Sequence, residues 1–233
     1  MMKSLALYHY ISVFVLLSLI NKTTAYWWGF NPDSNWMSHI SGDLKLNQIN
    51  IPGTHDSGMY SVKELYRSFA QTQDKNIIQQ LEMGVRYFDL RLAWSNNDII
   101  ISHGTGGLFN VKRVDAKHVN GKDLTLDIVL RTCRDYLSTN KKETIIAHLK
   151  IEDSTYKDKI INKVKSTYKS SSLYYTKNKI PSLRDVRGKI VIANRDGYYG
   201  ISLPINSLPK NVNYNEYKCI NNNNKCRTCT FIY

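Results

Sequence analysis

Two histidines, two carboxylates and one arginine lie at or just beyond the ends of three short apolar runs. The five residues are His55, Asp56, Asp89, Arg91 and His103. An imidazole titrates near neutral pH, so one histidine could take a proton from an attacking hydroxyl group while the other gives one to the leaving group. A guanidinium group binds phosphate oxygens in a bidentate manner, and a nearby carboxylate can fix a histidine tautomer. The set predicts chemistry at a phosphoester.

A histidine or a turn motif alone does not indicate catalysis. A buried histidine is more often a hydrogen-bonded structural residue, and residues 53–58 could form an ordinary turn with Asp56 as a helix cap. The prediction depends on the joint position of the five residues. In a β/α barrel the carboxyl ends of the strands meet at one face, and residues two apart on a strand, such as Asp89 and Arg91, share a side.

A scaffold of alternating strands and helices must position these residues. Runs rich in Ile, Val, Phe and Leu predict strands at residues 48–51, 86–92, 98–102, 144–149 and 189–193. Helices are predicted at 76–83, which ends at Gly84, and at 124–137 and 153–168. The alternation predicts an α/β fold with a parallel sheet, as in a TIM-type barrel.

Five blocks of this sequence resemble the X region of phosphatidylinositol-specific phospholipase C of the bacterial type, and a Trp36-Met37 pair precedes them. The blocks are Ile51-Pro-Gly-Thr-His-Asp-Ser-Gly58, Gly84-Val-Arg-Tyr-Phe-Asp-Leu-Arg91, Ser102-His-Gly104, Glu143-Thr-Ile-Ile-Ala-His-Leu-Lys150-Ile-Glu152 and Arg187-Gly-Lys-Ile-Val-Ile-Ala-Asn-Arg195. Their order and spacing cover about residues 36–195. The resemblance implies the PLC-like kind of TIM barrel.

The resemblance also implies a role for each matching residue. His55 is expected to be the general base for the inositol 2-hydroxyl group, and His103 the general acid for the diacylglycerol oxygen. Arg91 is expected to stabilise the phosphate charge, with Asp56 and Asp89 supporting the acid and the arginine. Three further residues match positions that contact the inositol ring. They are Lys150, Glu152 and Arg195.

No cofactor is expected. The calcium-dependent relatives carry an acid-x-acid pair on the second strand and an Asn after the first histidine, where this sequence has Asp89-Leu-Arg91 and Asp56. A guanidinium group in place of calcium implies a metal-independent enzyme.

Other parts of the family pattern have no convincing counterpart here. They are a later acid that pairs with the first histidine, and a later Asp and Tyr of the inositol pocket. A complete barrel needs about 250 residues, and only five strands are predicted, so we expect an incomplete barrel. Either the sequence ends partway through a longer protein, which we favour because an open parallel sheet leaves an unpaired edge, or it is a short, divergent relative.

The two ends of the chain differ in character from the middle. Residues 1–25 combine Lys3, an apolar run and small residues before position 26, which predicts a secretory signal peptide and an extracellular protein; an uncleaved anchor is the alternative. The catalytic domain is expected at residues 26–200. Residues 201–233 are expected to be an irregular tail whose three cysteines could form disulfides or, with less support, bind zinc.

The chain has 233 residues and a net charge of +13, which favours anionic partners. We expect a monomer that acts on a phosphatidylinositol-type lipid and touches an anionic membrane surface. The alternative is an inactive protein that binds inositol phosphate or a membrane. Nucleic acid is disfavoured as a partner because the basic residues are scattered and form no known motif. A glycerophosphodiester phosphodiesterase is also disfavoured, because it would need a His-Arg opening and a metal-binding acid pair, and neither is present.

Overall fold

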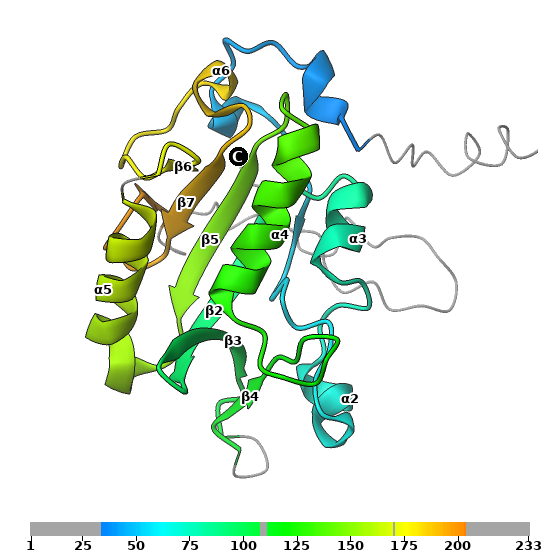
Figure 1. Cartoon of the computed structure of the whole chain (residues 1–233), viewed down its shortest axis with the longest axis vertical. Helices are drawn as coiled ribbons and strands as arrows, with labels where there is room; N and C mark the ends of the chain where they lie inside the picture. The colour runs from blue at the N-terminus through cyan, green and yellow to red at the C-terminus, as the bar shows by residue number, and fades with distance from the viewer. Residues whose placement is uncertain (1–33, 108–110, 170, 204–233) are drawn as a thin grey trace, which may run out of the picture. The chain divides into compact units, whose positions relative to one another are not determined.

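An eight-stranded mixed sheet forms the centre of the protein (Figure 1). The computed structural model describes residues 34–107, 111–169 and 171–203. The strands are β1 (Gly53–Thr54), β2 (Tyr87–Ser95), β3 (Asp98–Gly104), β4 (Arg113–Asp115), β5 (Ile145–Ile151), β6 (Tyr174–Tyr175), β7 (Ile190–Asn194) and β8 (Ile201–Ser202). In the described residues the sheet is open, which is consistent with an incomplete barrel.

The parallel strands carry the barrel-like part of the sheet. The order β2, β5, β7 is parallel throughout; β1 pairs with the first part of β2, and β6 and β8 pair with β7. The register aligns Asp89 with His148 and Arg91 with Lys150. Because side chains alternate along a strand, these residues all lie on one face of the sheet.

The opposite face of the sheet is covered by helices. These are α3 (Ile77–Glu82), α4 (Leu126–Thr139) and α5 (Lys157–Tyr168), together with the short helix α2 (Arg67–Ala70); the short helix α6 (Leu183–Val186) packs on the other face. Figure 1 shows α4 and α5 lying along β5 and β7. Their buried side chains join those of Phe88, Leu90 and Leu149 in the larger apolar core. Burial of this apolar surface fixes which face of the sheet remains for the polar residues.

Short 3-10 helices close the sheet at the amino ends of its strands. They are η1 (Trp36–His39) and η2 (Leu46–Gln48); η3 (Glu64–Tyr66) and η5 (Ser154–Tyr156) precede α2 and α5. Met37, Leu46 and Ile51 pack with Tyr87 and Val191 in a second apolar core that also includes two residues of α6. This core forms an apolar floor below the polar residues of the same face.

The structure confirms most predicted elements and corrects three. The predicted strand at residues 48–51 is wrong. Ile49 and Ile51 are instead buried in the second core, and strand pairing begins at Gly53. The strand at 98–102 exists but is antiparallel to β2, because Asn96 and Asn97 (φ 48° and 59°) form a two-residue hairpin turn. The expected irregular tail begins with a strand, β8.

The helix predictions at 76–83 and 124–137 are confirmed by α3 and α4. Asn76 caps α3 by accepting from the backbone N–H of Gln79, and Gly84 follows that helix at φ 89°, a left-handed value that suits glycine. The predicted helix at 153–168 splits into η5 and α5. Cys133 is a buried free thiol in α4; the proposed signal peptide and the other three cysteines lie outside the described residues.

Candidate active site

The structure brings all eight predicted site residues to one end of the parallel strands. His55 and Asp56 follow β1, Asp89 and Arg91 lie on β2, and His103 lies on β3. Lys150 lies on β5 one residue before its end, and Glu152 and Arg195 follow β5 and β7. Ion pairs or hydrogen bonds join every one of them to at least one other member of the set. His103 arrives by the β2–β3 hairpin and not, as predicted, at the end of a parallel strand.

Backbone contacts fix the loop after β1 against β2. The Ser57 backbone N–H donates to the Asp89 carbonyl at 2.8 Å, and the Asp89 N–H donates to the Ser57 hydroxyl at 2.9 Å. Gln73 holds the next turn by donating to the carbonyl of His55 at 2.6 Å. Asp56 has φ 44°, a left-handed conformation that Asp tolerates better than most residues. These contacts place His55 and Asp56 next to Asp89 before any ligand is present.

Asp56 lies between the two histidines. Its Oδ2 is 3.6 Å from His55 Nε2 and 3.2 Å from His103 Nε2. Asp56 is 1% exposed, and burial raises the pKa of its carboxyl group. His55 is the more open of the two imidazoles, with 42% of its side chain exposed against 22% for His103. Both rings can therefore meet a ligand while one carboxylate links them.

Arg91 is surrounded by three carboxylates. Its Nε is 2.7 Å from Asp56 Oδ1, its Nη2 donates to Asp89 Oδ2 at 3.0 Å, and its Nη1 donates to Glu152 Oε1 at 2.8 Å. Although burial opposes the charged form, Asp89 and Asp56 raise the pKa of Arg91, so it stays a fixed cation. A planar cation held in this way can bind the oxygens of a phosphate group.

Glu152 connects the cation of β2 to the residues predicted to contact substrate. Lys150 Nζ donates to Glu152 Oε1 at 2.6 Å. Burial alone would raise the pKa of Glu152, but the hydrogen bonds and charges of Lys150 and Arg91 lower it. A Cβ atom at Gly104 would lie only 2.9 Å from Glu152 Oε2, so glycine leaves room for this carboxylate. Arg195 Nη2 donates to Asp89 Oδ1 at 3.1 Å from the other side.

A model of the phosphatidylinositol-specific phospholipase C X domain matches residues 49–196 of the chain. A curated 1-phosphatidylinositol phosphodiesterase of Staphylococcus aureus is 34% identical over 174 residues, which are 70% of this chain and 51% of that protein. One of Listeria monocytogenes is 35% identical over 170 residues, covering 69% of this chain and 48% of that protein. The chain belongs to the phosphatidylinositol-specific phospholipase C X-domain family.

Solved structures of this family share the fold. A phosphatidylinositol-specific phospholipase C of S. aureus matches with a TM-score of 0.58 at 31% identity, over 72% of this chain and 56% of that one. The enzyme from L. monocytogenes matches with a TM-score of 0.56 at 32% identity, over 75% of this chain and 64% of that one. The chain spans about half the length of the curated relatives it matches.

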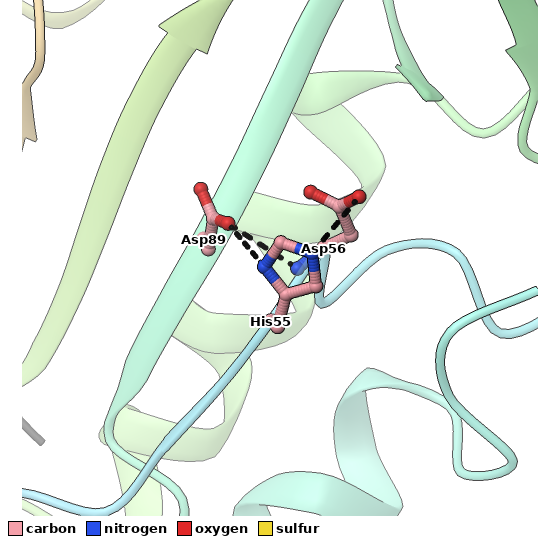
Figure 2. A group of neighbouring side chains, drawn as sticks. All are labelled: His55, Asp56 and Asp89. Carbon is pink, nitrogen blue, oxygen red and sulfur yellow. Dashed lines mark hydrogen bonds and ion pairs between the residues drawn. The ribbon is translucent and has the colours of Figure 1, made fainter. Parts of the chain in front are cut away.

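Three of the site residues carry the kind of ligand atoms that could hold a metal ion. His55, Asp56 and Asp89 each offer one ligand atom, and these atoms lie within 4.8 Å of one another (Figure 2). Arg91 contacts both carboxylates at 2.7 and 3.0 Å, so a cation already neutralises the oxygens that a metal ion would need. The donor set fits an arginine-based site better than a metal site.

Sequence reasoning missed a buried pair beneath the site. His148 lies on β5 in register with Asp89, is 5% exposed, and its Nδ1 is hydrogen-bonded to the Tyr87 hydroxyl group. Burial lowers the pKa of His148 to about 4, so the ring is neutral near pH 7. The signal was available: His148 lies two residues before Lys150 on a predicted strand, so both face the same side.

Proposed function

We propose that this protein is a phosphodiesterase that cleaves phosphatidylinositol, or its glycosylated derivatives, to diacylglycerol and inositol 1,2-cyclic phosphate. The observation that carries the proposal is the placement of His55 and His103 on either side of Asp56, with the Arg91 guanidinium group on the same carboxylate. One acid, one base and a fixed cation within one site are what an in-line transfer at phosphorus requires.

The proposed mechanism assigns a proton to each imidazole. His55 Nε2 takes the proton of the inositol 2-hydroxyl group as its oxygen attacks phosphorus, and the new P–O bond closes the cyclic phosphate. The P–O bond to diacylglycerol breaks, and His103 gives its proton to that oxygen. Arg91 stabilises the negative charge on the remaining phosphate oxygens. The two imidazoles thus exchange protonation states in each turnover.

The charge balance of the site supports a monoanionic ligand. Arg91, Arg195 and Lys150 are matched by Asp56, Asp89 and Glu152, so the site is formally neutral when both histidines are neutral. A phosphodiester adds one negative charge, which a protonated His103 compensates. Lys150, Glu152 and Arg195 offer donors and acceptors for the hydroxyl groups of an inositol ring.

Contact with a lipid surface belongs to the same proposal. Trp94 at the end of β2 stacks on Tyr156, and Lys159 Nζ lies 5.8 and 5.4 Å from the centres of the two rings. Lysines and indole rings suit the headgroup region of an anionic bilayer. No helix in the described part of the chain is long and apolar enough to cross a membrane. We also propose that the protein is a monomer and that it is secreted; the sequence of residues 1–25 supports secretion.

The test is turnover of phosphatidylinositol vesicles in the presence of EDTA. Phosphorus NMR should show inositol 1,2-cyclic phosphate with the wild-type chain, and His55→Ala should lower the rate by about 10²- to 10⁴-fold. His39→Ala is the matched control, because this exposed histidine of η1 lies outside the site. Loss of activity with EDTA and its recovery with calcium would contradict the metal-independent mechanism.

The same experiment addresses the alternative of an inactive binding protein. If wild-type and His55→Ala chains both bind inositol phosphate with equal affinity and neither releases product, the site binds its ligand without turnover, and the enzymatic proposal is wrong.

A further inference from the structure

The general base of the proposed reaction needs a fixed tautomer. His55 can accept a proton at Nε2 only if its neutral ring carries the other proton on Nδ1, and an acceptor at Nδ1 holds the ring in that form. In the described residues, the carboxylates of Asp56 and Asp89 lie within 4 Å of the ring nitrogens of His55.

Asp89 is in position to be that acceptor. Its Oδ2 lies 3.2 Å from His55 Nδ1, and its side chain is 5% exposed. It is held from several sides: Oδ2 accepts from the Asp56 backbone N–H at 3.3 Å, Arg91 Nη2 donates to Oδ2, and Arg195 Nη2 donates to Oδ1. Despite its burial, the hydrogen bond with His55 and the charge of Arg91 hold the pKa of Asp89 well below its usual range.

Asp56 cannot serve His55 in the same way, because it lies beside the other ring nitrogen. Figure 2 shows the two carboxylates on opposite sides of the imidazole ring. The distance from Asp56 Oδ2 to His55 Nε2 is 3.6 Å, longer than a hydrogen bond, and the same oxygen is closer to His103. The ring of His55 thus lies between the carboxylate of Asp89, which is close to Nδ1, and the carboxylate of Asp56, which also lies next to His103.

We propose that Asp89 is the positioning residue of His55: its carboxylate accepts from Nδ1–H and so presents Nε2 to the substrate hydroxyl group. The proposal rests on the proposed function of His55 as general base. One buried carboxylate then connects the base to the phosphate-binding arginine, since Asp89 contacts both His55 and Arg91. The hydrogen bond to Asp89 is also the main cause that raises the pKa of His55.

The experiment is nitrogen NMR of the histidine rings in the full chain, labelled with ¹⁵N and measured above the pKa of His55. In the wild-type chain, neutral His55 should carry its proton on Nδ1. Asp89→Asn should shift the ring toward the Nε2–H tautomer and lower the pKa of His55. If the vesicle assay shows turnover, kcat should also fall about 10²- to 10⁴-fold with little change in KM.

Asp56→Asn is the matched control, because it also removes one buried negative charge beside His55 and one contact of Arg91. It should lower the pKa of His55 but leave the proton on Nδ1. Equal tautomer shifts in the two variants, or none in Asp89→Asn, would overturn the proposal. If Asp89→Asn does not fold, the wild-type spectrum is sufficient: an Nε2–H tautomer of His55 there would overturn the proposal. Because the NMR result needs no turnover, a chain that releases no product but shows Nδ1–H contradicts only the proposed function.

Discussion

Arg86 and Arg91 lie five residues apart in the chain, but their guanidinium groups have different surroundings. Arg86, just before β2, is fully buried; its Nε donates to Glu143 at 2.8 Å, and its Nη1 donates to the carbonyls of Leu81 and Val85. Its Nη2 donates to the Ser34 carbonyl and to the hydroxyl group of Tyr136. Arg91, five residues later, is 11% exposed, and its ion-pair partners in the described residues are three carboxylates.

The difference separates a charge that is enclosed by protein partners from one that we propose to bind a phosphate group. A buried cation whose donors all have fixed protein acceptors holds chain segments together and offers nothing to a ligand. Arg91 instead lies in the same site as two partly exposed imidazoles, and its partners are the carboxylates of that site. The side-chain partners, and not the residue type, distinguish the two sites.

The largest expected effect is on the activity of Arg91→Lys. A lysine keeps the charge but loses the planar donors that bind two phosphate oxygens, so kcat should fall about 10³-fold. The free energy of unfolding should change little in comparison. Vesicle assays and thermal unfolding of the same preparation measure both; a variant with full activity would show that Arg91 does not contact the transition state.

The opposite outcome is expected for Glu143→Gln. It leaves the buried charge of Arg86 without its partner, so the free energy of unfolding should fall by about 3 kcal/mol and Tm by roughly 6 to 12 °C. The kcat of the folded fraction should stay near wild type. The double variant Arg86→Met with Glu143→Gln should regain most of the stability, and failure to do so would mean that the charge is not the cause.

A smaller effect concerns pH and His148, the buried ring beneath the site. Its folded-state pKa of about 4 lies below the ordinary value of 6.5, so in this range the unfolded chain binds more protons and stability rises with pH. Protonation of the unfolded chain should lower the free energy of unfolding by about 2 kcal/mol at pH 5 relative to pH 8. Denaturant titrations of wild type and His148→Gln measure this; identical pH slopes would contradict the prediction.

The smallest effect is expected for an ion pair on the surface. Arg131 and Asp127 are one helical turn apart on α4 and are joined at 2.6 Å, but both side chains are more than half exposed. Arg131→Ala should lower the free energy of unfolding by about 0.3 to 0.5 kcal/mol, an effect that salt reduces. A loss as large as that of Glu143→Gln would mean that exposure does not decide the strength of these pairs.

The sequence predicted most of the elements that carry the candidate site residues, and the structure brings these residues together. The apolar runs predicted the central strands β2, β5 and β7, and Gly84 predicted the end of α3. The strand at 48–51 was wrong because Ile49 and Ile51 are buried by packing in the floor of the sheet, which an apolar run alone does not distinguish from strand pairing. The antiparallel direction of β3 depends on a two-residue turn at Asn96 and Asn97. The prediction of a parallel strand did not take this turn into account.

By itself, the sequence determined which groups are available: two imidazoles, an arginine and carboxylates at spacings that the family shares. Only the tertiary structure decided their partners, because contacts between residues far apart in the chain depend on strand register and on burial. Parallel pairing of β2 with β5 placed Glu152 against Arg91 and His148 below Asp89. The same packing placed Asp89 at Nδ1 of His55 and Asp56 at Nε2. Because both residues are aspartates, the sequence alone does not show which of them lies at which nitrogen.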